Sequence, residues 1–399
     1  MEYYFSKRIG TVKPSAIREI LKLSSDPSVI AFSAGNPSAD CFPKEDIALY
    51  TGEILQNTPA LALQYGVTEG YTPLREALKE RCIKAYGAYD AARDELIVTT
   101  GAQQVFDLLT KVVCDEGDTV IAEGPAFVGA LSSFKSYGVN VVQADIDAHG
   151  MDLGELEEAI KTAENPRFIY CIPNFQNPTG YTMPLEKRKG ILSLAGKYSL
   201  LVLEDNAYGD IRFKGEHLPT IKSMDTEGRV VYAGSMSKLL SPGLRVGFVS
   251  ASAELIAKMT VAKQVSDVHT PILNQMVCHE FLTRSDVPGH IERINAVYLK
   301  KSDLMLGELD SGVGGLFRYT RPEGGLFIWC TLPAEADMLE FCSRAVKRNV
   351  AVVPGNAFYA DDAAKRQSFR LNFSSPSDES IVTGVGVLAE VAKELCRGS

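Results

Sequence analysis

The middle of the chain repeats one pattern, a short apolar run rich in β-branched residues followed by an amphipathic helical stretch. Leu200-Leu201-Val202-Leu203 is typical of these runs. They are too short for buried helices, and their nearly continuous apolar character suits strands that are covered on both faces. The alternation therefore predicts an α/β fold, in which a mostly parallel sheet lies between helices. Seven strands are expected, near residues 95–99, 118–122, 139–143, 167–172, 200–204, 229–234 and 245–250.

The pattern changes after about residue 285, where a long helical stretch leads into short β-rich runs and a closing helix. This order is typical of a smaller α+β unit. We expect a large domain over residues 44–285 and a small C-terminal domain over 286–399, which the N-terminal arm, residues 1–43, joins. No low-complexity linker separates them, so the boundary is expected inside a compact structure.

Composition narrows the classes of function. The 399 residues carry a formal net charge of -9, and such a chain lacks the basic face that binds nucleic acid or anionic membranes. No window approaches about 18 consecutive apolar residues, and the N-terminus has no apolar core of signal-peptide length. We expect a cytoplasmic protein that acts on small molecules, without membrane or nucleic-acid partners.

Neither the eight cysteines nor the five histidines form a metal-binding pattern. The cysteines show no C-x-x-C spacing, and the histidines include no H-E-x-x-H. We expect free thiols and no metal site.

One stretch, residues 234–248, combines an amine with groups that bind anions. It contains Lys238, the hydroxyls of Ser235 and Ser237, and the guanidinium of Arg245, and it has no carboxylate. Hydroxyls and a forked guanidinium suit a phosphate. A lysine without an acidic partner loses its proton readily when it is desolvated. The same composition also fits a surface turn with a solvated lysine.

Two further stretches lie at expected strand ends. Gly101 opens a helix, where free N–H groups suit a phosphate, although any such turn can contain glycine. Glu204 and Asp205 end another strand, where an acid is more often a helix cap or a solvated residue than a catalyst. Because parallel sheets bind ligands at the carboxyl ends of their strands, these positions can share a site with the lysine stretch.

Together with Asn177-Pro178-Thr179-Gly180, these stretches follow the order seen in fold-type-I enzymes that use pyridoxal 5'-phosphate (PLP). The chain resembles the class I/II aminotransferases among them, over residues 65 to 370. Within that family it looks most similar to the 2-aminoadipate and kynurenine aminotransferase group, on stretches such as Phe-Gln-Asn-Pro-Thr-Gly and His-Thr-Pro-x-Leu-Asn-Gln-Met. The resemblance implies an aspartate-aminotransferase-like fold, PLP as cofactor, and a homodimer with shared active sites.

The resemblance also implies roles for individual residues. Lys238 forms the Schiff base with PLP and acts as catalytic base, while Asp205 faces the pyridine nitrogen and Tyr208 the phenolic oxygen. Phe127 stacks on the ring where tyrosine is usual, or is plain core. Tyr65 reaches the phosphate of the neighbouring subunit, or is a core tyrosine ahead of a helix. The other cofactor contacts are implied for Gly101, Ala102, Gln103, Asn177, Ser235, Ser237 and Arg245.

The implied substrate contacts come from both ends of the chain. Arg370 clamps the substrate α-carboxylate together with Asn177, although a strand arginine is commonly just solvated. Asn174 is a weaker neighbour, and Gly35 lies in the turn that ends the N-terminal arm. Arg18, on an expected lid helix, offers a second carboxylate clamp; the alternative is a solvated helix arginine paired with a neighbouring glutamate.

The implied activity is that of an aminotransferase (EC 2.6.1.-), which moves an amino group between an L-amino acid and a 2-oxo acid. Glutamate and 2-oxoglutarate are the expected pair on one side, and 2-aminoadipate, an aromatic or a branched-chain amino acid is expected on the other. Two alternatives stay open: a PLP-dependent β-lyase on the same scaffold, and a sensor body that binds PLP without turnover. Lys238, Asp205 and Arg370 argue against the sensor.

Overall fold

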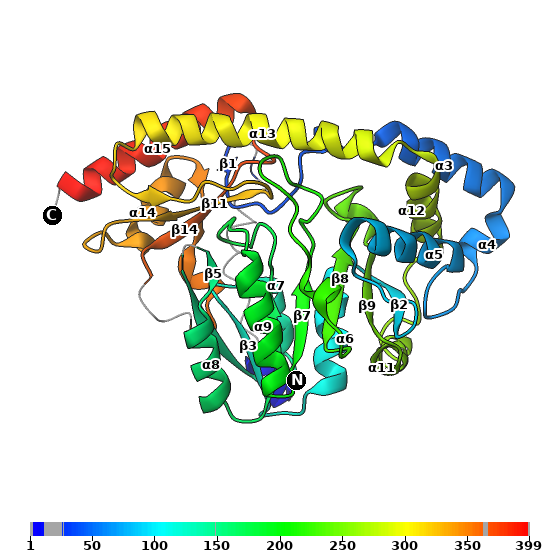
Figure 1. Cartoon of the computed structure of the whole chain (residues 1–399). Helices are drawn as coiled ribbons and strands as arrows, with labels where there is room; N and C mark the ends of the chain where they lie inside the picture. Colours follow the sequence, from blue (N-terminus) through cyan, green and yellow to red (C-terminus); the bar gives the residue numbers. More distant parts are fainter. Residues whose placement is uncertain (1–2, 12–25, 27, 148, 362–365, 398–399) are drawn as a thin grey trace.

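The computed structural model describes residues 3–11, 26, 28–147, 149–361 and 366–397. Its largest sheet has the spatial order β2-β9-β8-β7-β6-β3-β4-β5 (Figure 1). The strands are β2 (Asp94–Thr99), β3 (Thr119–Gly124), β4 (Asn140–Asp147), β5 (Gly150–Met151), β6 (Pro166–Cys171), β7 (Leu201–Asp205), β8 (Val230–Ser235) and β9 (Gly247–Ser252).

The mostly parallel sheet predicted from the repeated pattern is confirmed, with one strand more than expected. β3, β4, β6, β7 and β8 pair in parallel, whereas β9 runs antiparallel to both of its neighbours. The extra strand, β5, is two residues long and pairs antiparallel with the end of β4. So short a strand has no apolar run of its own, which is why the sequence pattern missed it.

Helices cover both faces of this sheet. Neighbouring residues of a strand point to opposite faces, so an apolar strand contributes side chains to a core on each face. In β6, Phe168 and Tyr170 join a core with α6, α7 and α11, while Ile169 joins a second core with α8, α9 and α10. The helices are α6 (Ala102–Val113), α7 (Val128–Lys135), α8 (Leu153–Thr162), α9 (Leu185–Lys197), α10 (Ile221–Met224) and α11 (Ala253–Gln264).

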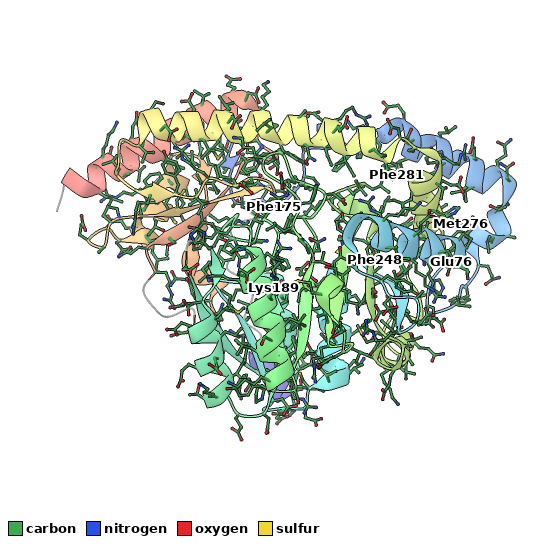
Figure 2. All side chains as sticks on the ribbon, in the orientation of Figure 1. Glu76, Phe175, Lys189, Phe248, Met276 and Phe281 are labelled. Atoms are coloured by element: carbon green, nitrogen blue, oxygen red, sulfur yellow. The ribbon has the colours of Figure 1, made fainter. Side chains whose placement is uncertain are left out.

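A third core packs at the β2–β9 end of the sheet. Phe248 of β9 meets Met276 and Phe281 of a neighbouring helix there (Figure 2). The helices at this end are α3 (Lys44–Asn57), α4 (Pro59–Leu63), α5 (Thr72–Arg81) and α12 (Ile272–Arg284), and α5 continues into one π turn, Cys82–Tyr86.

The C-terminal part forms a smaller unit around an antiparallel sheet of order β10-β11-β14-β13. Its elements are β10 (Arg318–Tyr319), β11 (Phe327–Thr331), α14 (Met338–Lys347), β12 (Val350–Ala351), β13 (Val353–Pro354), β14 (Ser368–Asn372) and α15 (Asp378–Arg397). β1 (Ile30–Ala31), from the N-terminal arm, pairs with β12. The arm therefore adds to this unit, while the domain limits at residues 43 and 285 stay predictions.

One long helix, α13 (Val287–Gly312), runs along the molecule from α3 and α12 at one end to α15 at the other (Figure 1). The remaining helical segments of the described residues are α1 (Lys7–Thr11) and three short 3-10 turns, Ala39–Cys41, Pro242–Leu244 and Gly355–Phe358. Among the described residues, no helix has both the length and the apolar character needed to cross a membrane.

Candidate active site

The carboxyl ends of β7 and β8, the start of α6, and residues of the smaller unit meet around a cavity of about 290 Å³. Only one of the described residues that line it is acidic, Asp205, whereas Lys238, Arg245 and Arg370 are basic. A cavity with this charge favours anionic ligands such as phosphates and carboxylates. The further lining residues are Ser33, Gly35, Ala102, Gln103, Phe106, Phe127, Val128, Ile172, Asn177, Ala207, Tyr208, Ser235 and Ser237.

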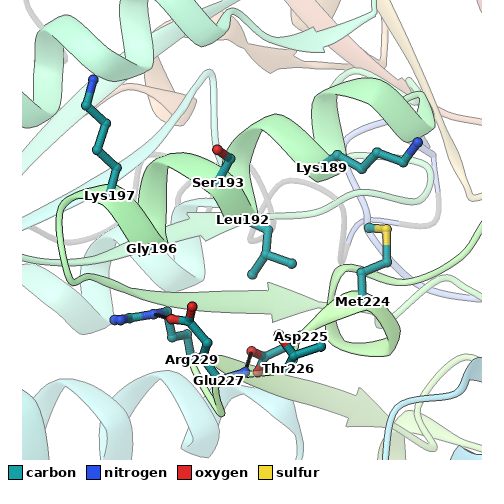
Figure 3. A pocket seen from close by; sticks show the side chains of 10 residues that line it. All are labelled: Lys189, Leu192, Ser193, Gly196, Lys197, Met224, Asp225, Thr226, Glu227 and Arg229. Carbon is teal, nitrogen blue, oxygen red and sulfur yellow. Dashed lines mark hydrogen bonds and ion pairs between the residues drawn. The ribbon is translucent and has the colours of Figure 1, made fainter.

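A larger hollow, of about 650 Å³, lies elsewhere, between α9 and the turn before β8 (Figure 3). It sits at the amino end of β8, on the opposite edge of the sheet. Its three cations are already paired, Lys189 with Glu186, Lys197 with Glu157 and Arg229 with Glu227. We therefore identify the smaller cavity as the site from its chemistry, since parallel sheets bind ligands at the other edge.

Lys238 projects into the smaller cavity from the loop after β8. Its Nζ donates to the carbonyl of Gly35, at 2.9 Å. Burial, and then the positive charges of Arg370 and Arg245, lower the pKa of this amine to about 8. A neutral, nucleophilic amine is thus accessible near physiological pH.

Groups that bind an anion gather at one end of the cavity. Gly101 has a φ of 75°, and a side chain there would collide with the guanidinium of Arg245. A Cβ on Gly247 would lie 2.7 Å from the nitrogen of Ala102, so β9 packs directly against this turn. The first N–H groups of α6 have no partners within the helix, and the guanidinium adds a positive charge beside them. With Ser235 and Ser237, the turn forms a phosphate-sized donor set.

The carboxylate of Asp205, the last residue of β7, also lines the cavity. It accepts hydrogen bonds from the hydroxyl of Tyr170 (3.0 Å) and the N–H of Ala207 (3.2 Å). Burial raises the pKa of Asp205 to about 6, and a cationic group in contact with the carboxylate would oppose that shift. The side chain is therefore suited to pair with a positive charge.

A third group of side chains links the large sheet to the smaller unit. Arg370 donates to Asn177 Oδ1 (2.9 Å) and to the carbonyl of Ser33 (2.8 Å). Its guanidinium lies 4.2 Å from the centre of the Phe327 ring. Asn177 Nδ2 in turn donates to the hydroxyl of Tyr208, at 3.2 Å. Burial lowers the pKa of Arg370 to about 10, and its Nε has no hydrogen-bond partner among the described residues. A buried guanidinium with a donor to spare suits a carboxylate ligand.

The structure brings most of the predicted site residues together, with three exceptions. Asn174 does not line the cavity, because its amide accepts from Arg188 Nη2 (2.7 Å) and donates to Asn206 (2.8 Å) behind it. Tyr65 is 82% exposed, so the alternative of a core tyrosine is wrong. Arg18 lies outside the described residues. Phe127 both lines the cavity and packs edge-on against Phe106, at 6.4 Å between ring centres.

Sequence reasoning missed Tyr170, although it occupies the strand next to Asp205. Its position in the apolar run of β6 predicts only a core residue. Five residues that line the cavity were also missed, and apart from Ala207, which neighbours Asp205 in the same motif, they carry no sequence signal. These are Ser33, Phe106, Val128, Ile172 and Ala207.

Comparison with known proteins identifies a family. The chain matches Aminotransferase class I and II over residues 27–388. It is 40% identical to the 2-aminoadipate transaminase of Thermus thermophilus over 394 residues, 98% of this chain and 97% of that one. It is 39% identical to aromatic-amino-acid aminotransferase 1 of Thermococcus litoralis, over 98% of this chain and 95% of that one.

A solved structure is equally similar. The alpha-aminoadipate aminotransferase of Thermus thermophilus, complexed with N-(5'-phosphopyridoxyl)-L-leucine, superposes with a TM-score of 0.90 and 38% identity. The match covers 99% of this chain and 98% of the other. Together, family and fold indicate PLP as the cofactor. The donor set fits it, because the cavity is lined by an anion-binding turn with Arg245, by an amine and by a buried carboxylate. With the cavity and these matches in agreement, the chain belongs to the class I and II aminotransferases.

Proposed function

We propose that this PLP-dependent aminotransferase uses glutamate and 2-oxoglutarate as one pair, and 2-aminoadipate, an aromatic or a branched-chain amino acid as the other. The names of the similar enzymes support this range, since they are a 2-aminoadipate transaminase and an aromatic-amino-acid aminotransferase. The observation that carries the reaction is the buried lysine amine, which faces the linked Arg370 and Asn177 across one cavity.

The residues that line the cavity would hold the cofactor. Its phosphate would be held by Ala102, Gln103 and the turn at Gly101, with Ser235, Ser237 and Arg245 on the other side. Asp205 would hold a proton on the pyridine nitrogen, and Tyr208 with Asn177 would donate to the phenolic oxygen. Bound PLP supplies a ring that withdraws electrons from the Cα of the attached amino acid.

Substrate is oriented by Arg370 and Asn177, which would bind its α-carboxylate. The free Nε of Arg370 supports a forked contact, because a guanidinium binds a carboxylate best with two parallel donors. Lys238 Nζ then takes the proton from the substrate Cα and later returns a proton. Its hydrogen bond to the Gly35 carbonyl supports this role, since the acceptor directs the amine without the charge of a carboxylate.

We further propose a homodimer with shared sites. Tyr65 is exposed and contacts the ring of His269, at 5.8 Å between centres. The two segments so joined expose large apolar side chains of the kind that a second subunit covers. These are Leu61, Leu63, Val67, Val265 and Val268. Light scattering of the purified protein tests this proposal, and a monomer at micromolar concentration would contradict it. The cytoplasmic location stays a prediction.

The substrate proposal is tested with the purified enzyme, PLP and 2-oxoglutarate against a panel of amino acids. We expect glutamate to form with 2-aminoadipate, aromatic or branched-chain amino acids. Release of pyruvate and a leaving group in the absence of any 2-oxo acid acceptor would instead indicate the β-lyase. Inertness of the PLP-loaded protein to the whole panel would indicate the sensor body.

Arg18 is proposed to contact the distal carboxylate of dicarboxylic substrates. A charge-assisted contact of this kind is worth about 1.5–3 kcal/mol, so Arg18→Ala should lower kcat/KM roughly 10- to 100-fold for 2-aminoadipate and glutamate. Leucine and phenylalanine should change little. Equal losses for both classes would show that Arg18 does not recognise the side chain.

A further inference from the structure

A second buried lysine, Lys263 on α11, organises a polar cluster beside the start of α6. Its side chain is fully buried. The Nζ donates to Gln104 Oε1 (2.8 Å), to both oxygens of Asp267 (2.9 and 3.0 Å) and to Thr270 Oγ1 (3.1 Å). An ammonium has only three protons, so these four acceptors occupy all of them. Lys263 therefore serves the cluster rather than a ligand.

The cluster holds Thr100, the residue before the glycine turn. The N–H of Thr100 donates to Gln104 Oε1, at 2.8 Å, and its hydroxyl donates to Asp267 Oδ2, also at 2.8 Å. Its carbonyl accepts from Arg245 Nη2, at 3.3 Å. Thus every polar group of Thr100 is engaged, two of them by acceptors that Lys263 also binds.

This arrangement connects Lys263 to the anion-binding end of the cavity. Thr100 leads directly into Gly101 and Ala102, and it also holds the guanidinium of Arg245. Arg245 also donates to the carbonyl of Pro242, at 3.3 Å, but Thr100 is the residue that contacts the arginine, leads into the helix start and is fixed by the cluster.

We propose that Lys263 is a positioning residue for the phosphate of PLP, acting through Gln104, Asp267 and Thr100. The proposal rests on the phosphate site proposed above.

The test compares two aldehydes that differ only in the phosphate. Apoenzyme is titrated with PLP and with pyridoxal, and binding is followed by the absorbance of the lysine-bonded aldehyde. Lys263→Met should weaken PLP binding roughly 10- to 100-fold, the range for loss of charged hydrogen bonds. Pyridoxal, which has no phosphate, should bind as it does to the wild type.

The chain contains a matched control. Lys222 is a second buried lysine in an ion pair, 2.8 Å from Asp94 Oδ1, at the opposite edge of the sheet. Lys222→Met should lower the Tm of the apoenzyme, but it should leave the ratio of its affinities for PLP and pyridoxal unchanged. If Lys263→Met weakens both aldehydes equally, or neither, the proposal is wrong.

Two further variants separate the possible failures. Asp267→Asn keeps the shape of a half-exposed side chain, so it tests the cluster even if Lys263→Met does not fold, and we expect a selective loss of PLP affinity of about 3- to 10-fold. Retention of full PLP affinity in that variant would overturn the proposal.

Arg245→Ala tests the phosphate site itself. If Arg245→Ala weakens the binding of both aldehydes equally, the assignment of the phosphate site is wrong. If Arg245→Ala weakens only PLP binding and Lys263→Met does not, only the proposed role of Lys263 is wrong.

Discussion

Two lysines lie on either side of β8, and they differ in the partners that surround the amine. Lys222, before the strand, lies 2.8 Å from the carboxylate of Asp94. Lys238, after the strand, contacts a neutral carbonyl at 2.9 Å and faces two guanidinium groups. The partner decides the chemistry: an ion-paired ammonium is structural, whereas a desolvated amine among cations gives up its proton.

The largest expected difference between the two lysines is in turnover. Lys238→Met should lower kcat by about 10⁴-fold, because both the nucleophile and the base are lost. Lys222→Met should leave kcat unchanged in the fraction that folds. Glutamate formation under saturating PLP measures both. Appreciable turnover in the Lys238 variant would mean that another group moves the Cα proton.

The methionine variants of the same two lysines should also differ in their stability toward unfolding. Removing one partner of a buried ion pair leaves the other charge unpaired, so Lys222→Met should lower the free energy of unfolding by about 3–5 kcal/mol. The double variant Lys222→Met/Asp94→Leu should recover most of this loss. Urea unfolding of the apoenzymes provides the measurement, and a fully stable single variant would contradict the structural role.

For Lys238 the expected change in the free energy of unfolding has the opposite sign. Its pKa falls to about 8 from 10.5, so the folded chain binds fewer protons than the unfolded chain between these pH values, and stability rises with pH there. Lys238→Met should therefore stabilise the apoenzyme by up to roughly 3 kcal/mol below pH 8. The gain should shrink as the pH rises and vanish above about pH 10.5. A gain that does not vary with pH would point to packing rather than charge.

A smaller effect is expected from the cations that face Lys238. Arg370→Met removes one of them, so the pH at which the apoenzyme bonds PLP should move upward. The same variant should lower kcat/KM for all amino acids roughly 10- to 100-fold, through the lost carboxylate contact. Arg284→Met, at a surface arginine paired with Glu53 and Glu280, is the control and should change neither quantity. An unmoved pH midpoint would show that Arg370 does not contribute to the lowered pKa of Lys238.

Much of the site could be predicted because each motif is local. Ser235, Ser237 and Lys238 follow one strand, and Asp205 with Tyr208 follows another, so the parallel sheet necessarily carries both to one edge. Asn174 illustrates the limit of such reasoning. It belongs to the same motif as Asn177, yet its amide turns to Arg188 and Asn206, and a motif does not reveal which face of a loop a side chain takes.

By itself the sequence determined the strand and helix order and the class of fold, because periodicity encodes these features, and its resemblance to a known family implied roles for Lys238, Asp205 and Arg370. Only the tertiary structure decided which residues these side chains contact. Lys238 reaches Gly35 across 203 residues and Arg370 reaches Asn177 across 193, and Tyr170, Lys263 and Thr100 acquire their roles in the same way. Contacts between residues so distant in the chain depend on how the layers pack, and no local pattern records that packing.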